Sequence, residues 1–303
     1  MTDSKGRLMQ GEQTDEFLSG IDTFFFDCDG VIWLGNEAIA GAVETVNKLR
    51  AKGKRIFFVS NNSSKSVASY MKKFQRFGIE AYPDEIYGTA KVTAWYIKNK
   101  LNFTGKVYLL GSESMAEEFD ALDISHTGTG PDPFHGNLDT CIGSVSLDDD
   151  IGAVVQGLDI HVNYMKMIKA TSYLAKESCL LIVTNEDDRL PVRGSNIVIP
   201  GTGSIGAILR VASRRQDRIL IGKPNRNIYD CILSKHSINP ESSCMIGDRI
   251  DTDIAFGIKC GFKTILVYSG VSTADEVEAL RKKSPEMLPD YCLPTLADLM
   301  RIP

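Results

Sequence analysis

The sequence predicts an α/β fold with a parallel sheet, and three observations lead to this prediction. Short apolar runs, rich in β-branched and aromatic residues, alternate along the chain with segments of helical periodicity. Most of these runs are apolar throughout rather than alternating, as expected for parallel strands buried on both faces. The helical segments supply the right-handed crossovers that parallel strands require. With 303 residues, the chain has room for one or two domains.

The predicted strands and helices follow one another in this alternating order. The expected strands are 23–27, 55–60, 106–111, 151–159, 179–185, 196–200, 218–223, 243–248 and 263–269. The expected helices are 40–52, 67–77, 90–98, 164–175, 204–213 and 228–235. The stretch 126–137 is rich in Gly and Pro and is predicted to be a loop.

Composition and charge exclude several classes of protein. The 34 basic and 39 acidic residues give a net charge of −5, whereas binding to a nucleic-acid backbone needs a concentrated basic face. The seven Cys contain no C-x-x-C pair, so neither a disulfide framework nor a zinc site is expected, and a reducing compartment is favoured. The N-terminus is polar, and no apolar run approaches the ~20 residues that span a bilayer. We therefore expect a soluble, cytoplasmic protein that binds neither nucleic acid nor membrane.

Four of the predicted strands end in polar side chains. These are Asp27 and Asp29 at strand 23–27, Ser60, Asn61 and Asn62 at strand 55–60, Lys223 at strand 218–223, and Asp248 and Asp253 at strand 243–248. Because ligands of open parallel sheets bind at the carboxyl ends of the strands, we expect all four groups to face one site. Two carboxylates as close as Asp27 and Asp29 need a cation or hydrogen-bond donors, unless both lie in a solvated turn.

The motifs that hold these residues resemble those of one enzyme superfamily. D-x-D-G-V begins at Asp27, S-N-N at Ser60, G-K-P at Gly222 and G-D-R-x-D-T-D at Gly247. In this order they are similar to the motifs of the haloacid dehalogenase (HAD) superfamily of aspartate-nucleophile phosphatases. D-x-D alone is common, but four motifs in order are specific, and the resemblance covers nearly the whole chain. It implies a Rossmann-like core with a parallel sheet.

The resemblance implies a role for each residue in the hydrolysis of a phosphate ester. Asp27 would attack phosphorus and form an aspartyl-phosphate, and Asp29 would protonate the leaving oxygen and then activate water. Lys223 would stabilise the charge of the transition state. The phosphate oxygens would be bound by Ser60, Asn61 and Asn62.

The resemblance also implies a magnesium ion. Two carboxylates beside a phosphate dianion would repel it, so a cation is required, and Mg²⁺ prefers oxygen ligands. The expected ligands are the side chains of Asp27 and Asp248 and the backbone carbonyl of Asp29. Asp253 would hold a metal-bound water.

The long segment between Ser60 and Lys223 predicts an inserted domain, since strand connections are normally short. Its predicted strands and helices suffice for an α/β cap, and the resemblance implies a C2-type cap that closes over the site. The expected domains are 1–98 and 211–303 for the core and 99–210 for the cap. Related enzymes commonly dimerise through this cap, which implies a homodimer as one arrangement.

The cap segment TNEDDRLP, residues 184–191, bears on the substrate. The pyridoxal phosphate phosphatase type has Trp-His where this chain has Arg189-Leu190, and the chain instead resembles the phosphoglycolate/glycerol-3-phosphate type. Arg189 could pair with a substrate carboxylate, or else form a surface ion pair with Asp187 or Asp188. The expected substrate is a small phosphorylated metabolite, 2-phosphoglycolate or glycerol-3-phosphate. A pyridoxal phosphate phosphatase and a broad-specificity 4-nitrophenylphosphatase are the alternatives.

Particular residues disfavour other interpretations. G-x-G-x-x-G at Gly201 fits a dinucleotide site, but the next strand ends in Lys223 rather than the acidic residue that binds a ribose. A catalytically inactive scaffold would usually have lost the nucleophile or a metal ligand, and both are present. A dehalogenase would need no acid at Asp29, because no alkoxide leaves. A mutase stays open, since it differs only in keeping water from the aspartyl-phosphate.

Overall fold

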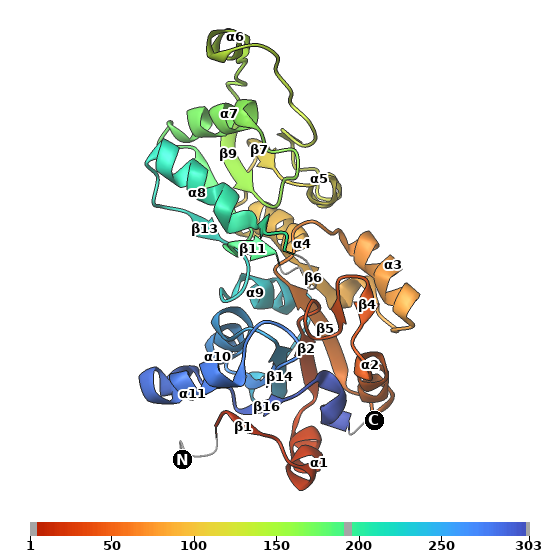
Figure 1. Cartoon of the computed structure of the whole chain (residues 1–303). Coiled ribbons are helices and arrows are strands. Elements are labelled where there is room, and N and C mark those ends of the chain that lie inside the picture. Colours follow the sequence, from red (N-terminus) through yellow and green to blue (C-terminus); the bar gives the residue numbers. More distant parts are fainter. Residues whose placement is uncertain (1–4, 191–195, 301–303) are drawn as a thin grey trace. The chain divides into compact units, whose positions relative to one another are not determined.

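The computed structural model describes residues 5–190 and 196–300. Within them the chain forms two compact units (Figure 1). The core unit comprises the described parts of Met1–Ser60, Tyr70–Tyr87 and Lys223–Pro303. The inserted unit comprises those of Asn61–Ser69 and Gly88–Gly222. The inserted unit thus contains the described residues of the segment 99–210, while the cap boundaries stay a prediction.

The core unit is built on a seven-stranded sheet in the order β1-β16-β15-β14-β2-β5-β6. Its strands are β1 (Arg7–Leu8), β2 (Thr23–Phe26), β5 (Arg55–Ser60), β6 (Ile86–Gly88), β14 (Ser243–Gly247), β15 (Lys263–Val267) and β16 (Tyr291–Leu293). Each neighbouring pair from β1 to β5 in this order is parallel. The predicted α/β fold with a parallel core sheet is confirmed.

Helices and a small ribbon complete the core unit. The helices are α1 (Gly11–Gly20), α2 (Ala42–Ala51), α3 (Val67–Phe77), α9 (Asn227–Leu233), α10 (Ala255–Cys260) and α11 (Ala274–Lys283). The first three residues of α3 belong to the inserted unit and the rest to the core unit. The ribbon follows β2 and consists of two antiparallel strands, β3 (Trp33–Leu34) and β4 (Glu37–Ala38).

Aromatic side chains fix β2 in the middle of the core sheet. Phe24, Phe25 and Phe26 are fully buried, so the strand is covered on both faces. The Phe25 ring stacks on Phe57 of β5 at 5.3 Å and on Phe262 at 4.6 Å between centroids. Such aromatic pairs are worth about 0.5–1.5 kcal/mol beyond the area that they bury. The position of the residue that follows the strand is therefore well determined.

The inserted unit has its own parallel sheet, in the order β13-β10-β9-β7-β8. The strands are β7 (Lys106–Leu110), β8 (His126–Thr127), β9 (Ile151–Gln156), β10 (Leu180–Val183) and β13 (Ile219–Leu220). The helices are α4 (Thr89–Trp95), which continues as a π-helical turn Tyr96–Lys100, α5 (Glu113–Asp120), α6 (Leu138–Ser144), α7 (Tyr164–Leu174) and α8 (Thr202–Ser213). A separate pair of strands, β11 (Arg189–Leu190) and β12 (Ile199–Pro200), is antiparallel.

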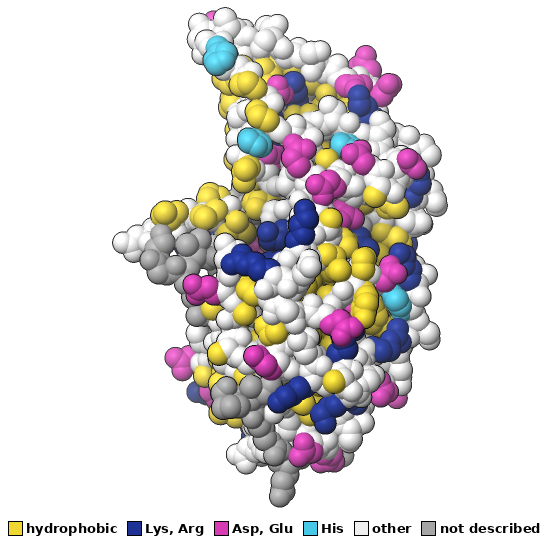
Figure 2. All heavy atoms as spheres, turned by 90° about the vertical axis from the view of Figure 1, so that its right-hand side faces the viewer, with side chains coloured by type: hydrophobic (Ala, Val, Ile, Leu, Met, Phe, Trp, Pro, Cys, Tyr) yellow, Lys and Arg dark blue, Asp and Glu magenta, His cyan; other side chains and the backbone are white. Residues whose placement is uncertain are grey.

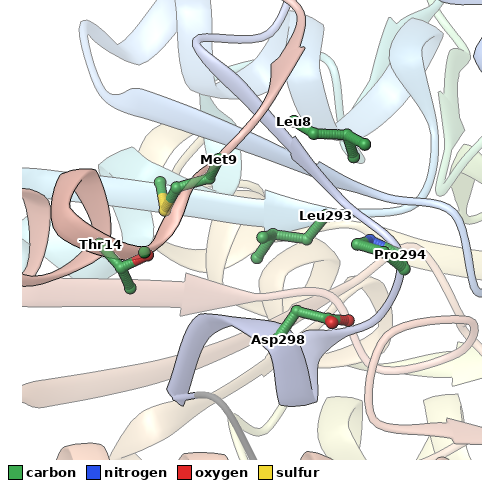
Figure 3. A pocket seen from close by; sticks show the side chains of 7 residues that line it. Leu8, Met9, Thr14, Leu293, Pro294 and Asp298 are labelled. Atoms are coloured by element: carbon green, nitrogen blue, oxygen red, sulfur yellow. The ribbon is translucent and has the colours of Figure 1, made fainter.

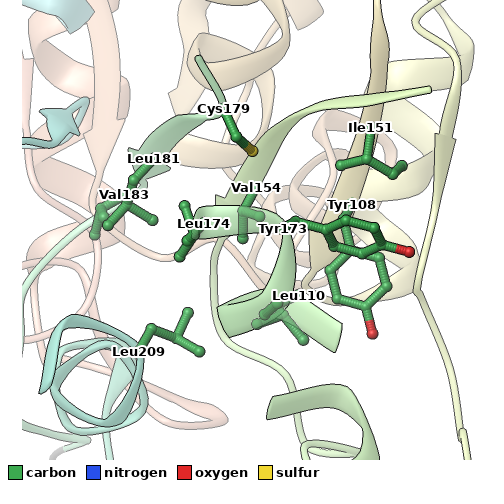
Figure 4. Close-up of a cluster of buried hydrophobic side chains, with 11 residues drawn as sticks. Tyr108, Leu110, Ile151, Val154, Tyr173, Leu174, Cys179, Leu181, Val183 and Leu209 are labelled. Carbon is green, nitrogen blue, oxygen red and sulfur yellow. The ribbon is translucent and has the colours of Figure 1, made fainter. Parts of the chain in front are cut away.

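A hydrophobic core of its own supports the inserted unit (Figure 4). Val154 of β9 and Val183 of β10 pack there with Leu174 of α7 and Leu209 of α8, and all four side chains are buried. The cluster consists wholly of residues of this unit. The inserted unit therefore has the separate core that a domain requires.

Two predicted strands differ from the structure. The run 196–200 forms only β12, which pairs antiparallel with β11 instead of joining a parallel sheet. The run 218–223 forms β13, which pairs with β10 of the inserted unit, so the prediction that Lys223 ends a strand of the core sheet is wrong. An apolar run can add to the open edge of either sheet, and its pattern does not name its neighbour.

The surface mixes both charges. On the face that Figure 2 presents, Lys and Arg side chains are interspersed with Asp and Glu. Among the described helices, none is long and apolar enough to cross a membrane. All seven cysteines are free and buried.

Candidate active site

Three predicted site residues lie at the carboxyl ends of three neighbouring strands. Asp27 directly follows β2, Ser60 is the last residue of β5, and Asp248 directly follows β14. These strands are adjacent in the order β14-β2-β5, and the Asp27 N–H donates to the carbonyl of Ile246 in β14 at 2.9 Å. All three side chains are buried. The parallel register of the sheet thus brings together residues that are far apart in the sequence.

Lys223 joins this group although no strand of the core sheet carries it. Its Nζ lies 2.6 Å from Asp27 Oδ1 and 2.7 Å from Asp253 Oδ1, and it donates to the carbonyl of Val59 at 2.9 Å. Only 3% of the residue is exposed. The ammonium group thus lies between two carboxylates and a backbone carbonyl, and its hydrogen bond to Oδ1 orients the Asp27 side chain.

Asp253 shapes the loop after β14. Its Oδ2 accepts hydrogen bonds from the N–H groups of Asp248 and Arg249, both at 3.1 Å. Its other oxygen faces Lys223, and 1% of the residue is exposed. Asp253 therefore connects the lysine to the backbone that carries Asp248.

Glycines make room for the Asp248 carboxylate. Asp248 Oδ2 accepts from the N–H of Val271 at 2.8 Å. A Cβ at Gly30, where φ is +92°, or at Gly270 would collide with this carboxylate. The close approach of two backbone segments thus depends on residues without a side chain.

Burial and neighbouring negative charge raise the pKa values of Asp27 and Asp248. Carboxylate oxygens of Asp27, Asp248 and Asp253 all lie within 4.8 Å of one another. Burial raises the pKa of Asp27 well above its usual range, although Lys223 opposes the shift. Burial, with the charge of Asp253, raises the pKa of Asp248 to about 7.

The same cluster keeps its lysine charged and has the donor chemistry of a metal site. Burial lowers the pKa of Lys223, but Asp253 and Asp27 outweigh burial and raise it above its usual value. One ammonium cannot balance three ionised carboxylates in a buried site. The set offers only oxygen ligands and an excess of negative charge, which fits a divalent cation such as Mg²⁺.

Asp29 lies in a different environment. It is half-buried, and its Oδ1 accepts a hydrogen bond of 2.9 Å from the indole Nε1 of Trp33. Lys73 Nζ lies 4.0 Å from the same oxygen. Asp29 is thus more exposed than Asp27 and contacts other partners.

Tyr70 of α3 holds the hydroxyl of Ser60. Its phenol donates to Ser60 Oγ at 3.0 Å, and 1% of Tyr70 is exposed. Burial raises the pKa of Tyr70 well above its usual value, so the phenol stays a donor. This contact could not be predicted from the sequence, because Tyr70 and Phe74 have the spacing of ordinary core residues.

Asn61, Asn62 and Arg189 belong to the inserted unit. The Asn61 carbonyl accepts from Thr89 Oγ1 at 2.8 Å, and Asn62 Oδ1 accepts from the N–H of Ser64 at 2.8 Å. Arg189 is exposed in β11, opposite Pro200 of β12. Pro191, the end of the motif that includes Arg189, lies outside the described residues. The predicted roles of these three residues in substrate binding stay predictions.

A pocket of about 310 Å³ in the core unit contains none of the predicted site residues (Figure 3). It lies between β1, the start of α1 and the segment after β16. The lining residues are Leu8, Met9, Gly11, Thr14, Leu293, Pro294 and Asp298. The one carboxylate among them, Asp298, accepts from the N–H and hydroxyl of Thr295 and so serves a local turn.

Comparisons with known proteins agree with this geometry. A family model described as haloacid dehalogenase-like hydrolase matches residues 24–125, and one described as HAD-hydrolase-like matches residues 220–299. The glycerol-3-phosphate phosphatase of Homo sapiens is 42% identical over 98% of this chain and 96% of its own length. The chloroplastic phosphoglycolate phosphatase 1A of Arabidopsis thaliana is 36% identical over 96% of this chain and 80% of its own length.

A solved structure has the same fold. The 4-nitrophenylphosphatase from Thermotoga maritima has a TM-score of 0.78 at 27% identity, and the match covers 94% of this chain and 98% of that one. The two family models include Asp27, Ser60, Lys223 and Asp248. The resemblance inferred from the four motifs is confirmed, and the chain belongs to the haloacid dehalogenase-like hydrolases, among their phosphatases.

Proposed function

We propose that this protein is a Mg²⁺-dependent phosphomonoester hydrolase that works through an aspartyl-phosphate on Asp27. The observation that carries the proposal is the contact of 2.6 Å between Lys223 Nζ and Asp27 Oδ1 within the buried acidic cluster. The contact orients one carboxylate oxygen and leaves the other for attack on phosphorus. The same ammonium offsets the negative charge that develops on the transferred phosphoryl group.

In the first step an oxygen of Asp27 attacks phosphorus, and the bond from phosphorus to the ester oxygen breaks. The leaving oxygen takes the proton of the Asp29 carboxyl group, which becomes a carboxylate. The products are an aspartyl-phosphate and the free alcohol. The half-buried position of Asp29 supports this role, because the group must meet both the substrate and water.

In the second step a water molecule attacks phosphorus and gives its proton to the Asp29 carboxylate. The bond between phosphorus and the Asp27 oxygen breaks, and inorganic phosphate leaves. Asp27 is again a carboxylate and Asp29 again carries its proton. Lys223 holds the Asp27 side chain in place through both steps. Ser60 would bind a phosphate oxygen, with its hydroxyl oriented by Tyr70.

The metal would be held by the side chains of Asp27 and Asp248 and by the backbone carbonyl of Asp29, with Asp253 on a water ligand. The all-oxygen donor set and the uncompensated charge of the cluster support this assignment. When bound, Mg²⁺ supplies the positive charge that lets these carboxylates and the phosphate dianion share one site.

We further infer that the substrate is 2-phosphoglycolate or glycerol-3-phosphate. Relatives that match almost the whole chain bear these names. The exposed Arg189 supports the phosphoglycolate assignment, because its planar guanidinium can pair with a carboxylate through two hydrogen bonds. The name of the Thermotoga maritima relative keeps 4-nitrophenyl phosphate as the second candidate.

A homodimer through the inserted unit is part of the same proposal. Ile197 and Val198 beside β12 and Val211 of α8 are large apolar side chains that are more than half exposed, as at surfaces that bind a partner. Sedimentation of the wild type and of Val211→Lys tests this part. A wild-type monomer would contradict it.

Phosphate release with and without Mg²⁺ tests the function. The substrates would be 2-phosphoglycolate, glycerol-3-phosphate, pyridoxal 5′-phosphate and 4-nitrophenyl phosphate, with Asp27→Asn as the blank. We expect kcat/KM for one of the first two esters to exceed that for the others by about tenfold or more, which is about 1.4 kcal/mol of transition-state binding. Arg189→Ala should reduce turnover of phosphoglycolate more than that of nitrophenyl phosphate. Preference for the pyridoxal ester would contradict the substrate assignment, and no release above the blank would contradict the function.

A further inference from the structure

We propose that Trp33 and Lys73 are positioning residues for the Asp29 carboxyl group. The proposal rests on the acid–base role proposed for Asp29 and adds two residues that act on it through fixed contacts. Trp33 Nε1 donates to Asp29 Oδ1 at 2.9 Å. Lys73 Nζ lies 4.0 Å from that oxygen and 4.0 Å from the centroid of the Trp33 ring. The three residues belong to the core unit.

The Trp33 side chain is held in one orientation. It is fully buried, and its ring packs against Phe74 at 5.2 Å and Phe77 at 5.7 Å, both on α3. Its backbone is fixed as well, because the Trp33 carbonyl accepts from the N–H of Gly30 at 2.7 Å. A buried indole N–H needs an acceptor, and here the acceptor is Asp29. The donor therefore sets the position of the carboxylate.

Lys73 acts on both partners of this hydrogen bond. Its ammonium lies over the face of the indole, where it is attracted to the ring electrons. A cation at this place withdraws electron density from the ring and makes the N–H a stronger donor. The Lys73 side chain is 12% exposed, so water weakens its interactions with the ring and with Asp29 less than at an open surface.

The arrangement distinguishes the two oxygens of Asp29. Oδ1 accepts from Trp33 and lies near Lys73, so the proton that Asp29 exchanges is directed to Oδ2. Fixing the carboxylate in this way places one oxygen for both proton transfers in the cycle. A carboxyl group that turned freely would spend less time in the productive geometry.

The test compares esters that differ in their need for an acid. Nitrophenolate leaves readily without a proton, whereas the alkoxide of glycerol-3-phosphate does not. For each ester, kcat/KM reports only the steps up to formation of the aspartyl-phosphate. It therefore isolates the role of Asp29 as an acid from its later role as a base. Trp33→Phe removes the N–H and keeps a ring, and Lys73→Met removes the charge and keeps a similar length.

We expect both variants to lower kcat/KM for glycerol-3-phosphate by about ten- to a hundredfold, with a change of at most about twofold for 4-nitrophenyl phosphate. Lys73→Arg keeps the cation and should restore most of the loss. The other Trp supplies matched controls, because Lys100 Nζ lies 5.9 Å from the Trp95 ring in the inserted unit. Trp95→Phe and Lys100→Met should leave unchanged the ratio of kcat/KM for glycerol-3-phosphate to kcat/KM for 4-nitrophenyl phosphate.

Asp29→Asn separates failure of this inference from failure of the proposed function. If Asp29→Asn affects both esters equally, the acid role itself is wrong. If Asp29→Asn discriminates between the esters but Trp33→Phe and Lys73→Met do not, only the positioning role is wrong. Lys73→Met decides alone if Trp33→Phe fails to fold, since the lysine is not part of the hydrophobic core.

Discussion

Lys223 and Asp27 are 196 positions apart in the sequence, yet their side chains meet at 2.6 Å. The lysine also contacts Asp253, which in turn binds the backbone N–H of Asp248. One ammonium thus connects the residue after β2 to the loop after β14. The proposed nucleophile and the proposed metal ligand are therefore positioned by one network.

Lys223→Met should abolish most of the activity. A buried pair that loses one partner leaves an uncompensated charge, and we expect kcat to fall by about 10²- to 10³-fold. Lys235→Met is the matched control, because Lys235 pairs with Asp84 at 3.3 Å on an exposed surface. The check is steady-state phosphate release, with circular dichroism to establish folding. Equal activity of the two variants would contradict the role of Lys223.

Mg²⁺ should stabilise the protein through Asp248. At a concentration of 100 times Kd, a ligand that binds only the folded state adds about 2.7 kcal/mol to the free energy of unfolding. Asp248→Asn should lose this gain, whereas Asp251→Asn should keep it. Asp251 lies three residues further on, in the π-helical turn Ile250–Ile254, and its carboxylate pairs with Arg249 at 2.7 Å. Thermal unfolding of both variants, with Mg²⁺ and with EDTA, measures this stabilisation. If Mg²⁺ still stabilises Asp248→Asn as it does the wild type, Asp248 is not a ligand.

Gly30→Ala should weaken Mg²⁺ binding more than a comparable change elsewhere. Gly30 and Gly35 both have positive φ values, +92° and +57°, so alanine strains the backbone at either place. A Cβ at Gly30 also collides with the Asp248 carboxylate, whereas a Cβ at Gly35 meets nothing within 4 Å. Calorimetric titration with Mg²⁺ should therefore show a loss of affinity only for Gly30→Ala. A similar loss at Gly35 would assign the effect to backbone strain.

The metal-free protein should lose stability as pH rises from about 4 to about 7. The pKa of Asp248 is raised to about 7 in the folded protein, while an unfolded Asp has a pKa of about 3.9. Between these values the folded state binds more protons than the unfolded state, so the free energy of unfolding falls with increasing pH. Asp248→Asn should flatten this part of the profile. Urea unfolding in EDTA at several pH values tests it, and identical profiles for the two proteins would contradict it.

The sequence predicts the position of a residue well where that residue ends or directly follows a core strand. Asp27, Ser60 and Asp248 occupy such places, and parallel register alone brings their strands together. Lys223 reaches the same site by another route. The strand that precedes it, β13, pairs in the inserted unit, and an apolar run does not reveal which sheet edge it joins.

The contacts of the side chains around these residues could not be predicted. Trp33 and Tyr70 have the composition and spacing of core residues, and only the packing of α3 shows that both donate hydrogen bonds to site residues. Lys73 has the polar character of an exposed helical position, although its ammonium lies over a buried ring. Long side chains choose among several neighbours, and their choice depends on tertiary geometry.

Trapping the phosphorylated enzyme tests whether Asp27 is the nucleophile. Protein quenched in acid during turnover of 4-nitrophenyl phosphate would be digested, and the peptides would be mapped by mass spectrometry. We expect one added phosphoryl group on Asp27, absent from Asp27→Asn and more abundant in Asp29→Asn, in which water is not activated. Phosphoryl transfer to another residue, or turnover by Asp27→Asn at the wild-type rate, would contradict it.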